Sequence, residues 1–251
     1  MQKHEAVLPL QLKSLKLSSF NMYWQDGNET AIKNNWEYSQ YLSYLCDLEI
    51  QKREQSRLTR RIKESSLPNG KTLSNFNFQA NKNINSSQIN ALANTDSWIK
   101  KASNILIFGP SGVGKTHIAS AIGYRQIELG SKVKFLQTSY LVQLLQQAKA
   151  QFRLKDLLVK LDRIPLIILD DIGYVKKDEH ETSVLFELIC QRYETGSLIV
   201  TSNQPFNKWD AIFPDNMMAV AAIDRLVHHS TIINIDGESY RLKNKKEEIN
   251  K

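Results

Sequence analysis

The sequence predicts an α/β fold in which helices flank both faces of a parallel β-sheet. Short runs of apolar and β-branched residues alternate with stretches of helical periodicity from residue 104 to residue 235. Such runs are typical of buried parallel strands, and intervening helices indicate right-handed crossover connections. A glycine-rich loop also separates the first apolar run from the first helical stretch, an arrangement found in phosphate-binding α/β proteins.

The expected elements follow one another in a regular order. The segments predicted to be strands are 104–108, 132–137, 165–170, 197–203 and 230–235. The segments between them that are predicted to be helices are 115–129, 139–161, 179–195 and 219–230. Gly130 and Gly196 follow two of these helices, at the position where a glycine commonly ends a helix.

Three regions can be distinguished along the chain. Residues 1–67 are expected to form a small helical domain, because apolar residues recur there at three- and four-residue steps, at Tyr41, Leu45, Leu48, Leu58 and Ile62. Residues 68–87 are rich in Asn and Ser and begin with a Pro-Asn-Gly turn, so they are expected to be a linker. Residues 88–251 are expected to form the α/β domain, entered through a short helix.

Composition and length narrow the class of protein. A chain of 251 residues with 41% hydrophobic residues can form one large domain with a small appendage. No apolar run approaches the roughly 18 residues that span a bilayer, and residues 1–17 mix charged and apolar residues, unlike a signal peptide. Cys46 and Cys190 are isolated, which argues against a disulfide framework or a cysteine metal site. We therefore expect a cytoplasmic protein with no membrane partner.

The segment "GPSGVGKT" predicts a binding site for the phosphates of ATP. It fits the pattern GxxxxGK[ST], with a predicted strand before it and a predicted helix after it. The glycines let the backbone wrap closely around phosphate, and the amide groups at the helix start face it. Lys115 is expected to reach the β- and γ-phosphates, and the Thr116 hydroxyl to ligate Mg²⁺. The nucleotide-binding residues are Gly109, Pro110, Ser111, Gly112, Val113, Gly114, Lys115 and Thr116.

Polar residues end two of the predicted strands and are candidates for catalysis. Asp170 ends "LIILDD" and is expected to hold Mg²⁺ through its water shell, while Asp171 could polarise the attacking water. A plain solvated turn is the alternative, but the apolar strand and the upstream P-loop favour the metal site. Asn203 ends "LIVTSN" at the edge where ligands bind in parallel sheets, so it could orient this water or simply occupy a turn.

Arg225 is a single arginine in the apolar helical segment "AVAAIDRLVHHS". A surface ion pair with Asp224 or Asp215 is the commoner fate of such an arginine. The functional interpretation is an arginine finger that reaches the ATP of a neighbouring subunit. The adjacent His228 and His229 have no cysteine or acid at ligand spacing, so we interpret them as helix-end residues rather than metal ligands.

The order of these motifs resembles the IstB-like ATPases, the helper proteins of insertion-sequence transposons. These belong with DnaC-type helicase loaders in the AAA+ superfamily. The resemblance covers nearly the whole chain, and "AAIDRLVHH…SYRLK" is its most specific part, because the other motifs occur in many P-loop proteins. It implies a P-loop AAA+ ATPase core with a small N-terminal helical domain.

The resemblance also implies roles for single residues. Asp170 matches the Mg²⁺-side acid, and Asp171 stands where most AAA+ proteins carry Glu, which could slow hydrolysis. Asn203 matches the first sensor, and Arg225 the arginine finger. Arg241, in "SYR", corresponds at best to a second sensor, because the chain stops soon afterwards and we expect no C-terminal helical lid.

A basic stripe in the N-terminal region predicts contact with DNA. Between residues 52 and 63 there are six basic side chains and one acid. In a helix, Arg53, Arg57, Arg60 and Arg61 share one face, as phosphate-binding arginines do. A solvated helix face is the bland alternative, and the overall net charge of +7 does not decide between them.

These observations predict an ATPase that binds duplex DNA, assembles into a homo-oligomer through ATP at subunit interfaces, and prepares DNA for a transposase. Its cofactors would be ATP and Mg²⁺. One rival is a loader that docks a replicative helicase and prefers single-stranded DNA. A second rival is a P-loop kinase that passes phosphate to a small molecule, although the sequence has no acceptor-site signature. Phe76 and Phe78 could form a core strand or line the adenine pocket.

Overall fold

The computed structural model describes residues 2–80, 84–174, 179–205, 208–209, 216–237 and 239–240. The chain forms two compact units, residues 1–60 and residues 61–251, which are described separately below. Arg241 and the residues that follow it lie outside the described part of the chain.

The first unit consists of helices α1 (Gln2–Ser14) and α2 (Ser18–Lys33) and most of the 28-residue helix α3 (Tyr38–Ser65). In this unit the buried carboxylate of Glu49 accepts hydrogen bonds from the Ser19 backbone at 2.7 Å and from Arg53 Nε at 2.8 Å. Burial alone would raise the pKa of Glu49, but these hydrogen bonds outweigh it and the pKa is lowered. The hydrogen bond between Ser19 and Glu49 therefore joins the start of α2 to the middle of α3.

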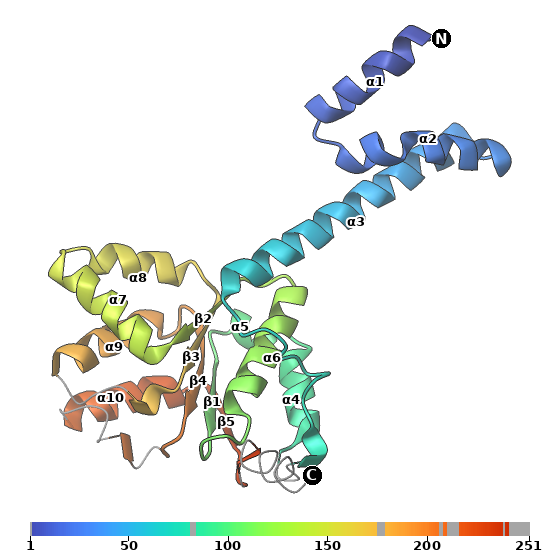
Figure 1. Ribbon diagram of the computed structural model, residues 1–251. Coiled ribbons are helices and arrows are strands. Elements are labelled where there is room, and N and C mark those ends of the chain that lie inside the picture. The colour runs from blue at the N-terminus through green and yellow to red at the C-terminus, as the bar shows by residue number, and fades with distance from the viewer. Residues whose placement is uncertain are drawn as a thin grey trace, which may run out of the picture. The chain divides into compact units, whose positions relative to one another are not determined.

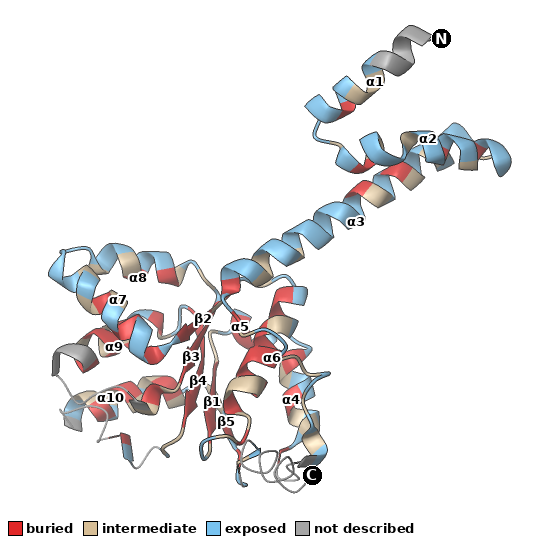
Figure 2. Ribbon diagram, in the orientation of Figure 1, coloured by how far each residue is buried: buried red, intermediate tan, exposed pale blue. Residues whose placement is uncertain are grey.

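The second unit is built on a five-stranded parallel sheet in the order β2-β3-β4-β1-β5. The strands are β1 (Asn104–Phe108), β2 (Val133–Gln137), β3 (Leu166–Asp170), β4 (Ser197–Ser202) and β5 (Ser230–Asn234). All residues of β1, β3 and β4 are buried, which explains why their sequences lack polar alternation (Figure 2). The five strands and the parallel sheet predicted from the sequence are confirmed.

Helices cover both faces of this sheet (Figure 1). One face carries α4 (Ser86–Ala93) and α6 (Lys115–Glu128), and the short helix α5 (Ser97–Lys100) leads into β1. The other face carries α7 (Thr138–Ala150), α9 (Glu179–Arg192) and α10 (Asn216–Val227), and α8 (Leu154–Asp162) packs beside α7. Two short 3₁₀ turns, Phe78–Ala80 and Ile172–Tyr174, complete the described elements.

The prediction of a single helix over residues 139–161 is wrong, because two helices, α7 and α8, occupy this segment. Phe152 adopts a left-handed conformation with φ of 56°, and the amide of Arg153 bonds to the carbonyl of Ala148 at 2.8 Å. This hydrogen-bond pattern ends a helix, and glycine usually takes the left-handed position. Phenylalanine there gives no such signal in the sequence.

The two predicted glycine stops have different outcomes. Gly130 has φ of 99° just after α6, so its prediction is confirmed. Gly196 does not end α9, because the helix stops at Arg192 and the left-handed residue is Glu194, with φ of 59°. A Cβ at Gly196 would lie 2.3 Å from Arg192 Nη2, so this glycine instead leaves room for the Arg192 guanidinium.

Candidate nucleotide-binding site

The loop between β1 and α6 has the backbone that the P-loop prediction requires. Gly109, Gly112 and Gly114 have φ of 153°, 84° and 104°, values that side-chain-bearing residues rarely adopt. A Cβ on Gly109 would lie 2.2 Å from the carbonyl oxygen of Ile235. A Cβ on Gly114 would lie 2.8 Å from the ring of Phe76. Close neighbours thus exclude side chains at these glycines.

Lys115 is buried and its ammonium group lies inside this loop. Its Nζ donates hydrogen bonds to the carbonyl oxygens of Gly109 at 2.8 Å and of Pro110 at 2.9 Å. The side chain of Val113 is also buried, whereas Pro110 and Ser111 are exposed. The loop therefore holds a buried positive charge against two of its own carbonyl oxygens, and a phosphate site needs such a charge.

Asp170, at the carboxyl end of β3, connects three elements of the site. One carboxylate oxygen accepts a hydrogen bond from Thr116 Oγ1 at 3.1 Å, and the other accepts one from Thr201 Oγ1 at 2.7 Å. Its backbone carbonyl accepts a hydrogen bond from Thr138 Oγ1 at 2.8 Å. The two residues expected to hold Mg²⁺, Thr116 and Asp170, are therefore in direct contact.

Thr138 was missed by the sequence analysis, and Thr201 lies in the segment "LIVTSN", for which a role was predicted only for Asn203. Thr138 begins α7 directly after β2, so it stands at the same sheet edge as Asp170. A hydroxyl residue directly after a buried parallel strand is the signal that could have identified it. Thr201 orients the Asp170 carboxylate, and Thr138 holds its backbone carbonyl. Carboxylates that bind metal ions commonly have such hydrogen-bond partners.

Asp171 and Asn203 lie on neighbouring turns after β3 and β4. Asp171 has φ of 57°, and its amide donates a hydrogen bond to Thr201 Oγ1 at 2.9 Å. Among the described residues, the buried amide oxygen of Asn203 has no hydrogen-bond partner, and a Cβ on Gly173 would lie 2.2 Å from it. A buried oxygen of this kind costs free energy unless water or ligand binds it.

Phe76 and Phe78 do not form a strand, so that interpretation is wrong. Their rings meet edge to face with centroids 4.8 Å apart, and the Phe76 ring also meets His117 at 5.0 Å. His117 Nε2 lies 2.8 Å from the carbonyl oxygen of Thr72. Residues from the predicted linker thus pack against the start of α6, and the alternative role in an adenine pocket stays a prediction.

Arg225 lies on the face of α10 that packs against α9. Its guanidinium donates to the carbonyl of Ala221 at 3.0 Å and stands 5.6 Å from the centroid of the Phe186 ring. The guanidinium therefore contacts a backbone carbonyl of its own helix and an aromatic ring of α9.

The four arginines of the basic stripe differ in their surroundings. Arg53 pairs with Glu49 and donates to the backbone of Lys16 at 3.0 Å, so it is part of the first unit's packing. Arg57 and Arg60 are exposed on α3, and Arg61 is half-buried near Gly130.

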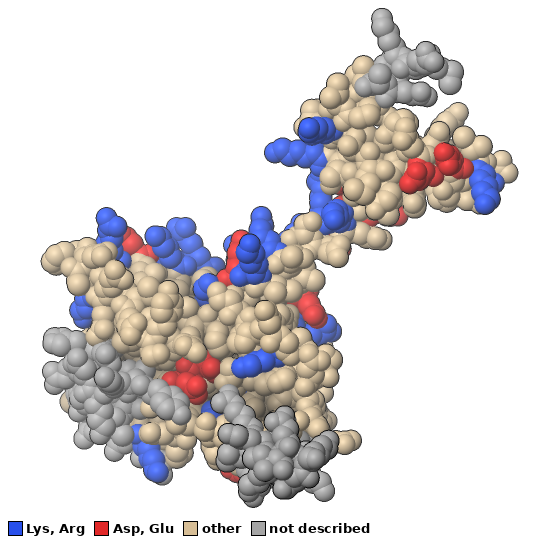
Figure 3. Space-filling model, in the orientation of Figure 1, with Lys and Arg blue, Asp and Glu red and all other residues tan. Residues whose placement is uncertain are grey.

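A second group of exposed basic residues lies on and around α8, and the sequence analysis did not single it out. Its members are Arg153, Lys155, Lys160 and Arg163. Figure 3 shows basic side chains along α3 and over α8.

The P-loop geometry and the Thr116–Asp170 pair fit a nucleotide with its magnesium ion. A parallel sheet of this strand order, with a P-loop after β1 and an acid after β3, defines an AAA+ P-loop protein. The fold class predicted from the sequence is thereby confirmed. Within the described residues, no helix is long and apolar enough to cross a bilayer.

The chain belongs to the IstB-like ATP-binding protein family, whose profile matches residues 10–248. An insertion-sequence ATP-binding protein of Sinorhizobium fredii is 46% identical over 94% of this chain and 80% of the relative. The IS21 ATP-binding protein of Pseudomonas aeruginosa is 37% identical over 95% of this chain and 90% of the relative. The resemblance stated from the motifs is confirmed.

Solved structures show the same fold at low sequence identity. AMPPCP-bound DnaA from Aquifex aeolicus superposes with a TM-score of 0.56 at 21% identity, over 74% of this chain and 56% of that one. DnaI superposes with a TM-score of 0.54 at 18% identity, over 65% of this chain and 90% of that one.

Proposed function

We propose that this protein hydrolyses ATP while assembled on duplex DNA and assists the transposase of an insertion sequence. The observation that carries the ATPase part is the contact of Thr116 with Asp170 beside a P-loop that already holds the Lys115 ammonium. The transposition part is supported by relatives that are named as insertion-sequence ATP-binding proteins. In this proposal residues 1–67 bind DNA or a partner, residues 68–87 link, and residues 88–251 form the ATPase domain.

The side chains divide the work at the nucleotide. Lys115 would exchange its loop carbonyls for phosphate oxygens, and the P-loop amides would bind the remaining phosphate charge. Thr116 and Asp170 would hold Mg²⁺, which supplies charge neutralisation on the phosphates. Asp171 and the buried amide oxygen of Asn203 would orient the attacking water. Asp171 is shorter than the usual glutamate, so we expect a slow basal rate.

Replacing Arg225 with alanine is expected to lower ATP turnover at least about tenfold and to weaken ATP-dependent self-association. An arginine finger stabilises charge that develops on the phosphates of the neighbouring subunit, so its loss affects turnover more than nucleotide binding. Steady-state phosphate release and sedimentation velocity, each with and without ATP, measure the two effects.

Arg125→Ala is the matched control, because Arg125 is an exposed arginine of the same unit that pairs with Glu128. It should leave both measurements at the wild-type level. If Arg225→Ala also leaves turnover and assembly unchanged, Arg225 is not the arginine finger. Retained nucleotide binding in the variant would show that its P-loop is intact.

Replacing Arg57 and Arg60 with glutamine is expected to weaken duplex DNA binding and to reduce its salt dependence. Each lost phosphate contact lowers the slope of log affinity against log salt by about one, so a decrease of about two is expected. Fluorescence anisotropy of a labelled duplex at several salt concentrations measures this slope.

The control for this variant replaces Lys13 and Lys33, two exposed lysines of α1 and α2, with glutamine. An equal decrease in the control would mean that only net charge matters. An unchanged slope in the Arg57/Arg60 variant would mean that these arginines form a solvated face of α3, and the corresponding Lys155/Arg163 variant would then test α8.

Two outcomes would favour the rival functions. Stimulation of ATP turnover by single-stranded DNA alone would favour helicase loading. Phosphate release that needs an acceptor other than water would favour a kinase.

A further inference from the structure

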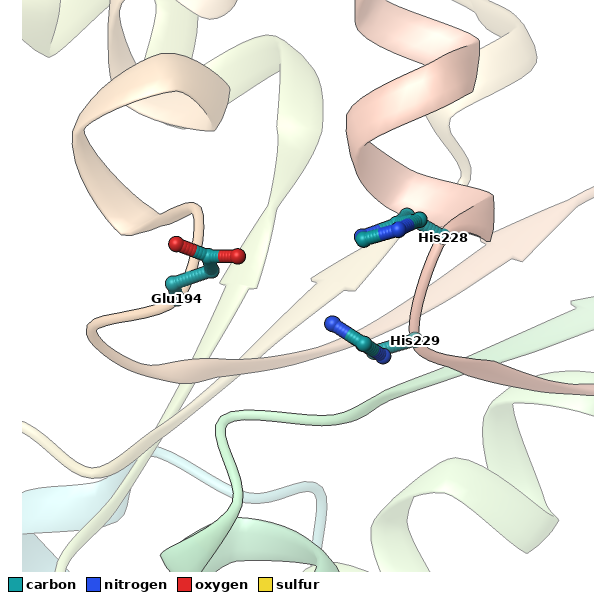
Figure 4. Close-up of side chains that lie close together, drawn as sticks. All are labelled: Glu194, His228 and His229. Atoms are coloured by element: carbon teal, nitrogen blue, oxygen red, sulfur yellow. The ribbon is translucent and has the colours of Figure 1, made fainter.

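Glu194, His228 and His229 form a cluster of metal-binding side chains at the other end of the sheet. Their ligand atoms all lie within 4.8 Å of one another, and all three residues are exposed. Glu194 precedes β4, and the two histidines lie between α10 and β5 (Figure 4). The cluster therefore stands at the amino ends of the strands, whereas the P-loop stands at their carboxyl ends.

The sequence analysis interpreted the two histidines as helix-end residues, and they do follow the end of α10, but the fold also places Glu194 beside them. The turn after α9 carries Glu194 in a left-handed conformation, with φ of 59°, and brings it next to the end of α10. Glu194 is 34 positions before His228 in the chain, so no local spacing could reveal the contact.

Backbone hydrogen bonds hold the two histidines in place while all three side chains of the cluster stay in solvent. The amide of His228 donates to the carbonyl of Asp224 at 2.9 Å, and the carbonyl of His229 accepts from the amide of Asn104 at 2.7 Å. The imidazole rings lie with centroids 4.1 Å apart. The ligand positions are therefore set by the fold, and only side-chain rotation is needed to adjust them.

Tyr193 contacts two of the three residues of this cluster. Its hydroxyl lies 2.9 Å from His228 Nδ1 and also bonds to the Glu194 side chain. The hydroxyl can accept a hydrogen bond from His228 Nδ1–H, and in that tautomer Nε2 of the ring has a lone pair that can bind a metal ion. Metal-bound histidines commonly have such a partner on the second ring nitrogen.

We propose that Glu194, His228 and His229 bind one divalent transition-metal ion of the Zn²⁺ type. Two imidazoles and a carboxylate are ligands that zinc accepts, with water in a remaining position. Bonds of about 2.0–2.1 Å bring tetrahedral ligands closer together than the observed limit, and rotation of exposed side chains supplies the difference. The ion would tie the turn after α9 to the junction of α10 and β5, three residues beyond Arg225.

Titration of the untagged full-length protein with Co²⁺ tests the site, because cobalt at a zinc site gives visible absorption bands. We expect one equivalent to bind, Zn²⁺ to displace it, and Zn²⁺ to raise the melting temperature of the protein. His229→Ala and Glu194→Gln should each weaken binding at least about tenfold. Nucleotide affinity should not change, which separates this result from a failure of the ATPase proposal.

Glu128→Gln is the matched control, because Glu128 is an exposed carboxylate of the same unit with its own partner, Arg125. It should bind Co²⁺ as the wild type does. The proposal is overturned if the wild type binds no Co²⁺ at millimolar concentration. It is equally overturned if His229→Ala and Glu194→Gln, shown to be folded by circular dichroism, retain wild-type affinity.

Discussion

Replacing Arg192 with leucine is expected to lower the free energy of unfolding of the ATPase unit by about 4 kcal/mol. The Arg192 side chain is fully buried at the end of α9. Its guanidinium donates to four backbone carbonyls, at 2.9 to 3.1 Å, which belong to Leu161, Ile164, Pro165 and Ser197. Leucine would leave these carbonyls without a donor, and each buried unsatisfied group costs about 1–3 kcal/mol.

The charge of Arg192 is retained despite its burial. Desolvation lowers the pKa of Arg192 to about 10, and Asp162, 4.0 Å away, opposes this shift. The group is therefore still protonated at neutral pH, where it joins the end of α8, the start of β3 and the start of β4. A lysine has one ammonium group in place of a planar fork, so Arg192→Lys should recover only part of the lost stability.

Gly196 provides an internal check, since a Cβ there would lie 2.3 Å from Arg192 Nη2. Gly196→Ala should destabilise the wild type but cost much less when Arg192 is already leucine. Arg163→Leu, at an exposed arginine nearby, should change stability by no more than about 0.5 kcal/mol. Urea unfolding followed by circular dichroism measures the stability of all these variants, and a loss below about 1 kcal/mol for Arg192→Leu would contradict this role.

Arg192 also shows where prediction from the sequence stops. The strands could be predicted because burial on both faces leaves a continuous apolar run such as Leu166–Leu169, a property of the local sequence alone. The partners of Arg192 come from three separate elements, and no residue near it in the chain signals them. For this reason the sequence analysis interpreted Gly196 as a helix stop, whereas the glycine leaves space for the Arg192 guanidinium.

In the candidate site, too, residues with a local sequence signal could be predicted, and residues that depend on the packing of distant elements could not. The P-loop could be located because its chemistry lies in one contiguous segment, and Asp170 because it ends an apolar strand. Thr138, which fixes the Asp170 backbone, depends on β2 lying next to β3, which is a property of the sheet order. The contact of Glu194 with His228 and His229 likewise depends on how α9 and α10 pack.

Replacing Lys115 with alanine is expected to reduce ATP turnover at least about a hundredfold and to weaken ATP binding. The Lys115 ammonium is buried and bonded to the carbonyls of Gly109 and Pro110. Alanine would remove the charge that neutralises phosphate and would leave those carbonyl oxygens facing it, so both binding and the charged transition state lose stabilisation. Equilibrium binding of a fluorescent ATP analogue and phosphate release measure the two effects separately.

Asp170→Asn and Lys101→Ala make the Lys115 result specific. Lys101 is an exposed lysine outside the loop, so its loss should change neither measurement. Asparagine at position 170 can still bond to the Thr116 and Thr201 hydroxyls but has lost the charge that attracts Mg²⁺. It should therefore reduce turnover as strongly as Lys115→Ala while keeping more of the nucleotide affinity. Equal losses of affinity in both variants would mean that Asp170 supports the loop rather than the metal, and wild-type turnover in Lys115→Ala would remove the P-loop from the proposed mechanism.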